Sequence, residues 1–313
     1  MNSKINIVLA ADNNYAQHTA VTMASILLNS SRKKSINFYL LCDNISVINK
    51  DKISATVRKL CGNIEFLEIE NRDFEKIYIS GHVSRAAYFR LDIANILSED
   101  IKKVIYLDAD LLVYDDIDKL WSIDIKEFPI AAVADYGIMT SRRLKKQKNV
   151  CFGLPFDAPY FNSGVLILNL DLWRKNNYSA KVIECASNNK FSNHDQDALN
   201  KIFMNNWYEL PLHWNVIPPI FNLFFKILLK SVFRRNAIKA KKNPSIFHYA
   251  GSYKPWEYVI YNGFNDKYYE YLHKTAFNDI KMPQIAKYKK GKSIRRQILR
   301  LKIANFWMKI FNN

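Results

Sequence analysis

The sequence lacks an apolar run long enough to cross a bilayer, and it is poor in cysteine. A spanning helix needs about 18 uninterrupted apolar residues, and the nearest approach, residues 217–229, contains prolines, Asn222 and Lys226. The first apolar run, residues 5–11, is short and ends at Asp12, unlike a secretory signal peptide. None of the four cysteines has zinc-site spacing: Cys42, Cys61, Cys151 and Cys185. We therefore expect a cytosolic protein without a membrane span.

The sequence also lacks internal repeats and low-complexity linkers. Its 313 residues are 49% hydrophobic, which is enough to bury a large core. We expect one large domain, residues 1–280, followed by a distinct segment, residues 281–313, and this boundary rests on charge alone.

Acidic residues are absent from two segments that carry the whole excess charge. Residues 226–242 contain seven Lys or Arg, and residues 281–313 contain ten. The rest of the chain has 29 basic and 29 acidic residues, so the net charge of +17 is local. Such segments indicate a polyanionic partner, either a membrane surface or nucleic acid.

Apolar strands alternate with helical patterns along most of the chain. The pattern predicts strands at residues 5–11, 36–42, 64–69, 104–107, 130–135 and 160–168, and helices at residues 15–28, 46–60 and 84–97, with helical starts at 171–175 and 195–203. Ser46 is a predicted helix cap. This alternation is typical of an α/β protein with a mostly parallel sheet flanked by helices. Residues 221–242 have no turn signals and are predicted to be an insertion with exposed apolar surface.

Two carboxylates follow the strand at residues 104–107. Asp108 and Asp110 flank Ala109, and in an extended segment residues i and i+2 point the same way. Both can therefore reach one cation, and hard oxygen ligands suit Mg²⁺ or Mn²⁺. The alternative is a solvated turn after a buried strand.

Two further polar segments stand where a sheet would present its ligand edge. Ala10, Asp12, Asn14 and Tyr15 offer close backbone approach, hydrogen-bonding groups and a ring, which fit a nucleobase, although a capped helix start is equally consistent. His82 and Arg90 belong to the second segment. Arg90 could pair with a phosphate or hold the carboxylates, or be an ordinary surface arginine.

Three later segments have the same ambiguity. Asn162 precedes a strand and suits a sugar hydroxyl or a plain turn. Asp195 and Gln196 could stabilise positive charge at an anomeric carbon, while Asp195 as an N-cap needs no further role. His248 could complete an Asp–Asp site for Mn²⁺ or be a satisfied core residue, and Gly251 and Lys254 suit a pyrophosphate.

Together these five motifs resemble glycosyltransferase family 8. This family comprises retaining, metal-dependent GT-A enzymes, including bacterial lipopolysaccharide galactosyl- and glucosyltransferases and, more distantly, glycogenin. The motifs occur in family order between residues 5 and 256. The resemblance implies a GT-A fold, Rossmann-like, and transfer of a hexose from UDP-glucose or UDP-galactose. Ala109 is smaller than the hydrophobic residue that often stands there in the family.

The resemblance also implies roles for the motif residues. Asp108, Asp110 and His248 would hold Mn²⁺ or Mg²⁺, which stabilises the leaving UDP as a Lewis acid. Tyr15 would stack on uracil. The other implied contacts are to uridine for Asp12 and Asn14, to phosphate for Gly251 and Lys254, and to the donor sugar for Arg90, Asn162, Asp195 and Gln196.

Retention of configuration leaves two mechanisms open. Gln196 is a poor nucleophile, which favours front-face return through an oxocarbenium-like state, with Asp195 as the alternative nucleophile in a double displacement.

The segment Lys281–Asn313 mixes basic, aliphatic and aromatic residues. This mixture fits an interfacial helix on an anionic membrane, although a solvated or docked terminal helix is possible. We therefore expect a peripheral protein at the cytoplasmic face of the inner membrane whose acceptor is a lipid-linked saccharide. The rivals are a soluble glycogenin-like or protein-directed transferase and a nucleic-acid-binding protein. No nucleic acid is expected, because the second rival leaves the five motifs unexplained.

Overall fold

The computed structural model describes residues 4–70, 74, 77, 84–153, 155–156, 158–225, 231–251, 254–257 and 264–279. Two expectations lie outside these described residues: the place of His82 and the structure of residues 281–313.

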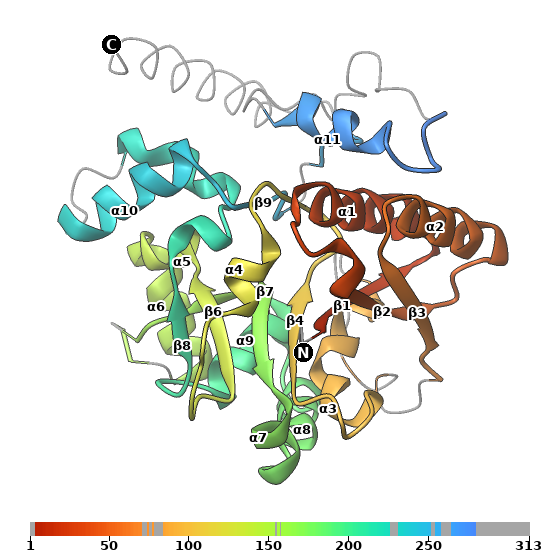
Figure 1. The fold of residues 1–313 in the computed structure, drawn as a ribbon. Coiled ribbons are helices and arrows are strands. Elements are labelled where there is room, and N and C mark those ends of the chain that lie inside the picture. The colour runs from red at the N-terminus through yellow and green to blue at the C-terminus, as the bar shows by residue number, and fades with distance from the viewer. Residues whose placement is uncertain are drawn as a thin grey trace.

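A seven-stranded sheet in the order β3-β2-β1-β4-β7-β6-β8 forms the centre of the molecule (Figure 1). Its strands are β1 (Ile5–Asp12), β2 (Ile36–Asp43), β3 (Asn63–Glu68), β4 (Lys103–Leu107), β6 (Ile130–Ala134), β7 (Phe161–Asn169) and β8 (Tyr208–Leu210). All neighbouring pairs are parallel except those of β7, which is antiparallel to both β4 and β6. The prediction of a mostly parallel α/β sheet is thus confirmed.

The reversed direction of β7 determines where the polar segments meet. The amino end of β7 lies beside the carboxyl end of β4, with Leu107 opposite Val165, and the Asp108 N–H donates to the Gly164 carbonyl at 2.9 Å. Residues at the amino end of β7 therefore lie at the same edge of the sheet as residues that follow the carboxyl end of β4.

Both faces of the sheet are buried, which explains why its strands are continuous apolar runs. Along β1, Ile5, Ile7 and Leu9 pack into one cluster, while Val8 and Ala10 pack into the other. The first cluster takes side chains from α1 (Ala16–Asn29), α2 (Val47–Lys59), α4 (Ile117–Trp121), α5 (Tyr136–Met139), α10 (Ser231–Lys242) and α11 (Asn265–Leu272). The second takes them from the 3₁₀ helix η3 (Arg85–Asp92), α3 (Ile93–Ile96), α7 (Leu170–Lys175), α8 (Tyr178–Ser187) and α9 (His194–Ile202).

The remaining helices are short 3₁₀ helices and the α-helix α6. The 3₁₀ helices are η1 (Asn13–Tyr15), η2 (Lys33–Ser35), η4 (Leu212–Trp214) and η5 (Pro218–Phe225). Helix α6 (Arg142–Phe152) contacts α5. Figure 1 shows α1 and α2 side by side, and the predicted Ser46 cap is confirmed, because its side chain accepts from the Asn49 N–H at the start of α2.

A second sheet of two strands completes the site. Strand β5 (Leu111–Val113) pairs antiparallel with β9 (Ile246–His248), with Leu111 opposite His248. The next N–H, that of Tyr249, donates to the Asp110 carbonyl at 2.9 Å. Residues 137 and 139 positions apart in the sequence are thereby brought into contact.

Two local predictions were wrong in detail. Residues 84–97 form η3 followed by the short α3 rather than one α-helix. Asp195 is not an N-cap: α9 begins at His194 after Asn193.

The insertion predicted at residues 221–242 includes α10, whose Val232 and Ile238 side chains are exposed as expected. Phe233 of α10 stacks on Tyr136 of α5 with ring centroids 5.6 Å apart. Among the described residues, no helix is both long and apolar enough to traverse a bilayer.

Candidate active site

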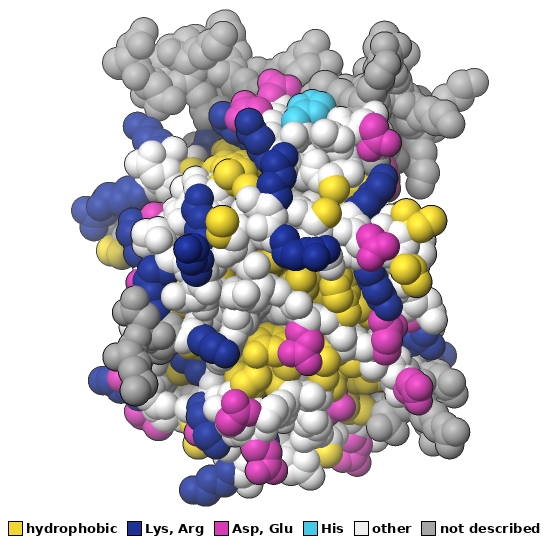
Figure 2. All heavy atoms as spheres, turned by 45° about the vertical axis from the view of Figure 1, so that its right-hand side comes forward, with side chains coloured by type: hydrophobic (Ala, Val, Ile, Leu, Met, Phe, Trp, Pro, Cys, Tyr) yellow, Lys and Arg dark blue, Asp and Glu magenta, His cyan; other side chains and the backbone are white. Residues whose placement is uncertain are grey.

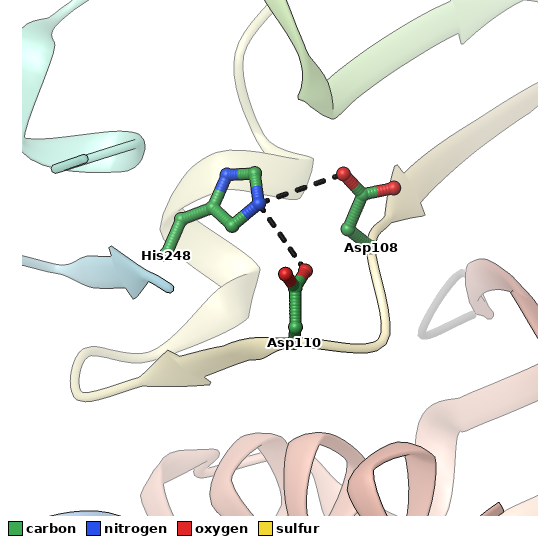
Figure 3. Close-up of side chains that lie close together, drawn as sticks. All are labelled: Asp108, Asp110 and His248. Atoms are coloured by element: carbon green, nitrogen blue, oxygen red, sulfur yellow. Dashed lines mark ion pairs between the residues drawn. The ribbon is translucent and has the colours of Figure 1, made fainter. Parts of the chain in front are cut away.

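Asp108 and Asp110 lie in the short link between β4 and β5, and His248 ends β9. The His248 Nε2 atom is 3.2 Å from Asp110 Oδ1 and 3.6 Å from Asp108 Oδ2. One ligand atom from each residue lies within 4.8 Å of the other two. Figure 3 shows the imidazole and both carboxylates converging on one point. The predicted metal ligands are thus brought together, as an oxygen-rich set with one nitrogen.

Asn215 fixes the orientation of the His248 ring. Its Oδ1 atom lies 3.0 Å from His248 Nδ1, so Nε2 is left to face the carboxylates. Metal-bound histidines commonly use the second ring nitrogen in this way. Sequence reasoning missed Asn215, which lies in an irregular stretch just after η4.

Strand β7 requires a glycine where it passes His248 and Asp108. A methyl group at Gly164 would come within 2.3 Å of His248 Cε1 and 2.7 Å of Asp108 Oδ2. Real Cβ contacts of this length do not occur, so the small residue of the Phe-Asn-Ser-Gly segment allows the ligands to approach β7.

Lys254 places a cation against Asp110. Its ammonium pairs with Asp110 and donates to the Tyr249 carbonyl at 2.8 Å. Burial alone would raise the pKa of Asp110, but Lys254 and His248 outweigh it and hold that pKa below its usual value. Asp110 is therefore kept as an anion, the form that binds a cation.

Arg90 joins the two halves of the site. Its guanidinium is 2.8 Å from Asp108 Oδ1 and 3.2 Å from Asp195 Oδ2, and it lies over the Tyr106 ring. It also donates to the Ser163 carbonyl at 2.9 Å. The surface alternative for Arg90 was wrong, because its side chain is only 5% exposed.

Asp195 and Gln196 project from the first turn of α9. Ser163 Oγ donates to Asp195 at 3.1 Å, and burial raises the pKa of Asp195 although Arg90 opposes this. The Gln196 Oε1 atom accepts from Asn162 Nδ2 at 3.0 Å and from the Ser163 N–H at 3.2 Å. All of these groups are buried, so the polar bonds among them define a rigid wall.

A cavity of about 680 Å³ opens between these groups. Twelve of the predicted site residues line it: Ala10, Tyr15, Arg90, Asp108, Ala109, Asp110, Asn162, Asp195, Gln196, His248, Gly251 and Lys254. The volume lies within the range usual for small-molecule sites.

Asp12 and Asn14 are not among the lining residues. The Asp12 side chain accepts from the Tyr15 N–H at 3.0 Å, which is the capping alternative considered for it. Tyr15 does line the cavity, with its ring edge-on to Trp256 at 6.0 Å between centroids.

Asp135 is a further cavity residue that sequence reasoning missed. It follows β6 and caps α5, while its second oxygen accepts from Gln196 Nε2 at 3.1 Å. A signal for it existed, because Asp135 is the last residue of the strand predicted at residues 130–135, and Asp108 likewise stands where an apolar strand ends.

The chain resembles proteins of one enzyme family over most of its length. Residues 6–259 match the model of Glycosyl transferase family 8. General stress protein A of Bacillus subtilis is 36% identical over 286 residues, covering 90% of this chain and 97% of that protein. The lipopolysaccharide 1,3-galactosyltransferase of Salmonella typhimurium is 27% identical over 259 residues, covering 81% of this chain and 73% of that enzyme.

The fold leads to the same family. The galactosyltransferase LgtC, solved with donor and acceptor sugar analogues, aligns with a TM-score of 0.75 at 27% identity, covering 90% of this chain and 98% of LgtC. Its GT-A fold is the mixed α/β architecture described above. The chain therefore belongs to glycosyl transferase family 8.

Proposed function

We propose that this glycosyltransferase is a retaining hexosyltransferase that moves glucose or galactose from a UDP-sugar to a lipid-linked saccharide, such as a lipopolysaccharide core or another surface glycan. The observation that carries the proposal is the convergence of Asp108, Asp110 and His248 on one wall of a cavity that Asp195 and Gln196 also line. A cation site beside a polar, buried wall suits a diphosphate joined to a sugar.

The ligand set fits a divalent cation of the Mn²⁺ or Mg²⁺ type. Two carboxylates and one imidazole offer hard oxygen and borderline nitrogen ligands, and Asn215 already turns His248 Nε2 toward the carboxylates. When bound, such a cation supplies Lewis-acid stabilisation of the diphosphate leaving group.

The chain's own residues can bind and orient the donor. We assign Lys254 and Gly251 to the diphosphate and Tyr15 to the uracil ring, with Asp12 and Asn14 near the uridine. Arg90 holds Asp108 and Asp195 in fixed positions, because its guanidinium bonds both carboxylates. The sugar then lies against Asn162, Asp195 and Gln196.

Front-face return is the mechanism that the contacts favour. The Gln196 amide oxygen already accepts two hydrogen bonds, and Asp195 is held by Arg90 and Ser163, so these contacts lower the nucleophilicity of both groups. In the proposed step the acceptor hydroxyl oxygen bonds to the anomeric carbon as the bond to UDP breaks. The hydroxyl proton passes to the departing phosphate oxygen.

A panel of UDP-sugars tests the activity, scored first by hydrolysis in Mn²⁺ and then by transfer to candidate acceptors. We expect Asp110→Asn to lower turnover at least 100-fold, because it removes a charged cation ligand whose loss costs several kcal/mol. Asp171→Asn is the matched control, since Asp171 is an exposed residue of α7. An Asp110→Asn protein with wild-type hydrolysis would refute the cation site.

The acceptor distinguishes the proposal from its rivals. A glycogenin-like transferase would add hexose to itself, which intact-mass spectrometry of the incubated enzyme detects. A nucleic-acid-binding protein would bind RNA in a salt-dependent way without turning over any UDP-sugar. We further propose that residues 281–313 bind an anionic membrane at the cytoplasmic face and bring residues 1–280 to the lipid-linked acceptor.

A further inference from the structure

A chain of amides connects His248 with the wall that faces the sugar. Asn215, Asn162 and Gln196 follow one another by hydrogen bonds, and all three side chains are buried. The direction of each bond in this chain follows from the groups that each amide faces.

Two backbone N–H groups set the direction, because they can only donate. The Gly164 N–H lies 3.0 Å from Asn162 Oδ1, and the Ser163 N–H lies 3.2 Å from Gln196 Oε1. Both of these side-chain atoms are therefore oxygens. It follows that Asn162 Nδ2 donates to Gln196 at 3.0 Å.

The same logic extends to Asn215 and then to the imidazole. The atom of Asn215 that lies 2.8 Å from Asn162 Oδ1 faces an oxygen, so it is the NH₂ group. Its other end, Oδ1, must accept from His248 Nδ1 at 3.0 Å. A neutral imidazole that donates from Nδ1 keeps its lone pair on Nε2, the atom that faces Asp108 and Asp110.

We infer that Asn215 is a positioning residue with two separable roles. Its oxygen selects the His248 tautomer whose Nε2 can ligate a cation, and its NH₂ group holds Asn162, which in turn orients Gln196. The inference rests on the proposed cation site. The inference adds that one side chain, that of Asn215, maintains the geometry of both the cation site and the amides that face the sugar.

Two variants separate these roles. Asn215→Ala removes both bonds, so we expect Mn²⁺ affinity to fall about 10-fold or more, as for other partners of metal-bound histidines. Asn215→Asp still accepts from His248 Nδ1 but cannot donate to Asn162. It should bind Mn²⁺ no more weakly than the wild type, while kcat falls about tenfold because Asn162 loses a buried donor.

Mn²⁺ binding is measured from the electron paramagnetic resonance signal of the free ion, and kcat from hydrolysis of the UDP-sugar that the panel selects. Long-range ¹H–¹⁵N spectra of the protein loaded with diamagnetic Mg²⁺ report the tautomer directly, because the cation replaces any proton on Nε2: Nδ1–H beside an unprotonated Nε2 in the wild type and in Asn215→Asp, and a mixture in Asn215→Ala. His248→Gln assigns the ring signals. Asn29→Ala is the control for general destabilisation, because Asn29 loses several bonds in the core between α1 and β5 but does not line the cavity.

Each outcome bears on a different claim. A wild-type protein that binds no Mn²⁺ overturns the proposed cation site and this inference with it. Wild-type binding that Asn215→Ala leaves unchanged overturns only the inference. Equal losses of Mn²⁺ affinity in Asn215→Asp and Asn215→Ala would reduce Asn215 to a structural residue and also overturn it.

Discussion

His18 is a buried imidazole whose protonation opposes folding. Its ring stacks on Trp256 with centroids 3.5 Å apart, and its Nδ1 shares a hydrogen bond of 2.6 Å with the Tyr268 hydroxyl. Burial lowers the pKa of His18 from 6.5 to about 3, although Asp110 opposes the shift. The folded protein thus keeps this imidazole neutral at pH values where the unfolded chain takes up a proton.

We expect this group to make stability fall in acid. The contribution of His18 to the free energy of unfolding is fully present above pH 6.5. It is lost as the pH falls from 6.5 to 3, at about 1.4 kcal/mol per pH unit. Urea unfolding between pH 7.5 and pH 5 measures the slope, and His18→Phe, which keeps an aromatic ring against Trp256, should flatten it by one proton. Equal slopes in the two proteins would contradict this prediction.

Residues at strand ends could be predicted from the sequence, but their partners could not. Asp108 and Asp110 were identifiable because an apolar run stops at them, and His248 because it belongs to one of the five motifs that resemble the family. Asn215 has no comparable pattern around it. Its role depends on two contacts across the fold, to His248 and to Asn162, and local sequence carries no information on such contacts.

Helix α6 is attached to the site by one buried ion pair. Lys148 Nζ lies 2.6 Å from Asp197 Oδ1, with side chains 4% and 0% exposed, and also donates to Asn193 Oδ1 at 2.9 Å. Leu144, one turn earlier on α6, lines the cavity. The pair therefore connects a cavity-lining helix to α9, which carries Asp195 and Gln196.

Removing the lysine should destabilise the fold markedly. Lys148→Met leaves Asp197 buried without its cation, and breaking such a pair costs about 3 to 5 kcal/mol. Lys146→Met on the exposed side of the same helix should change the free energy of unfolding by less than about 0.5 kcal/mol. Urea titrations of both variants provide the comparison, and similar midpoints would show that the pair contributes little.

Long elements were predictable from periodicity, and short ones were not. The strands that became β1, β2 and β3 and the helices α1 and α2 were placed within about two residues, since each repeats its pattern over several positions. Strand β9 has three residues and pairs with β5 far along the chain. Nothing within three residues specifies such a partner, so the second sheet was not anticipated.

The net positive charge of the molecule is unevenly distributed along the sequence. On the face drawn in Figure 2, basic and acidic side chains are interspersed, in keeping with a neutral balance outside the two basic segments. The ten basic residues of 281–313 are our proposed membrane contact.

Neutralising part of this segment should weaken binding to anionic vesicles without affecting chemistry. Replacing Arg295, Arg296, Arg300 and Lys302 with Gln removes four charges, each worth about 1 kcal/mol near such a surface, or roughly 10³-fold together. Sedimentation with phosphatidylglycerol vesicles measures binding, and UDP-sugar hydrolysis should stay at the wild-type level. Binding that persists undiminished would exclude these residues as the contact.

The pairing of β5 with β9 also sets a time at which the protein becomes competent. During synthesis the ribosome adds about 5 to 20 residues per second, so some 7 to 28 s separate the appearance of Asp110 from that of His248. A nascent chain can form β1, β2 and β4 while the third ligand is still unmade. The proposed cation site is therefore complete only after the late strand has been made, and a polypeptide released before it would lack the third ligand.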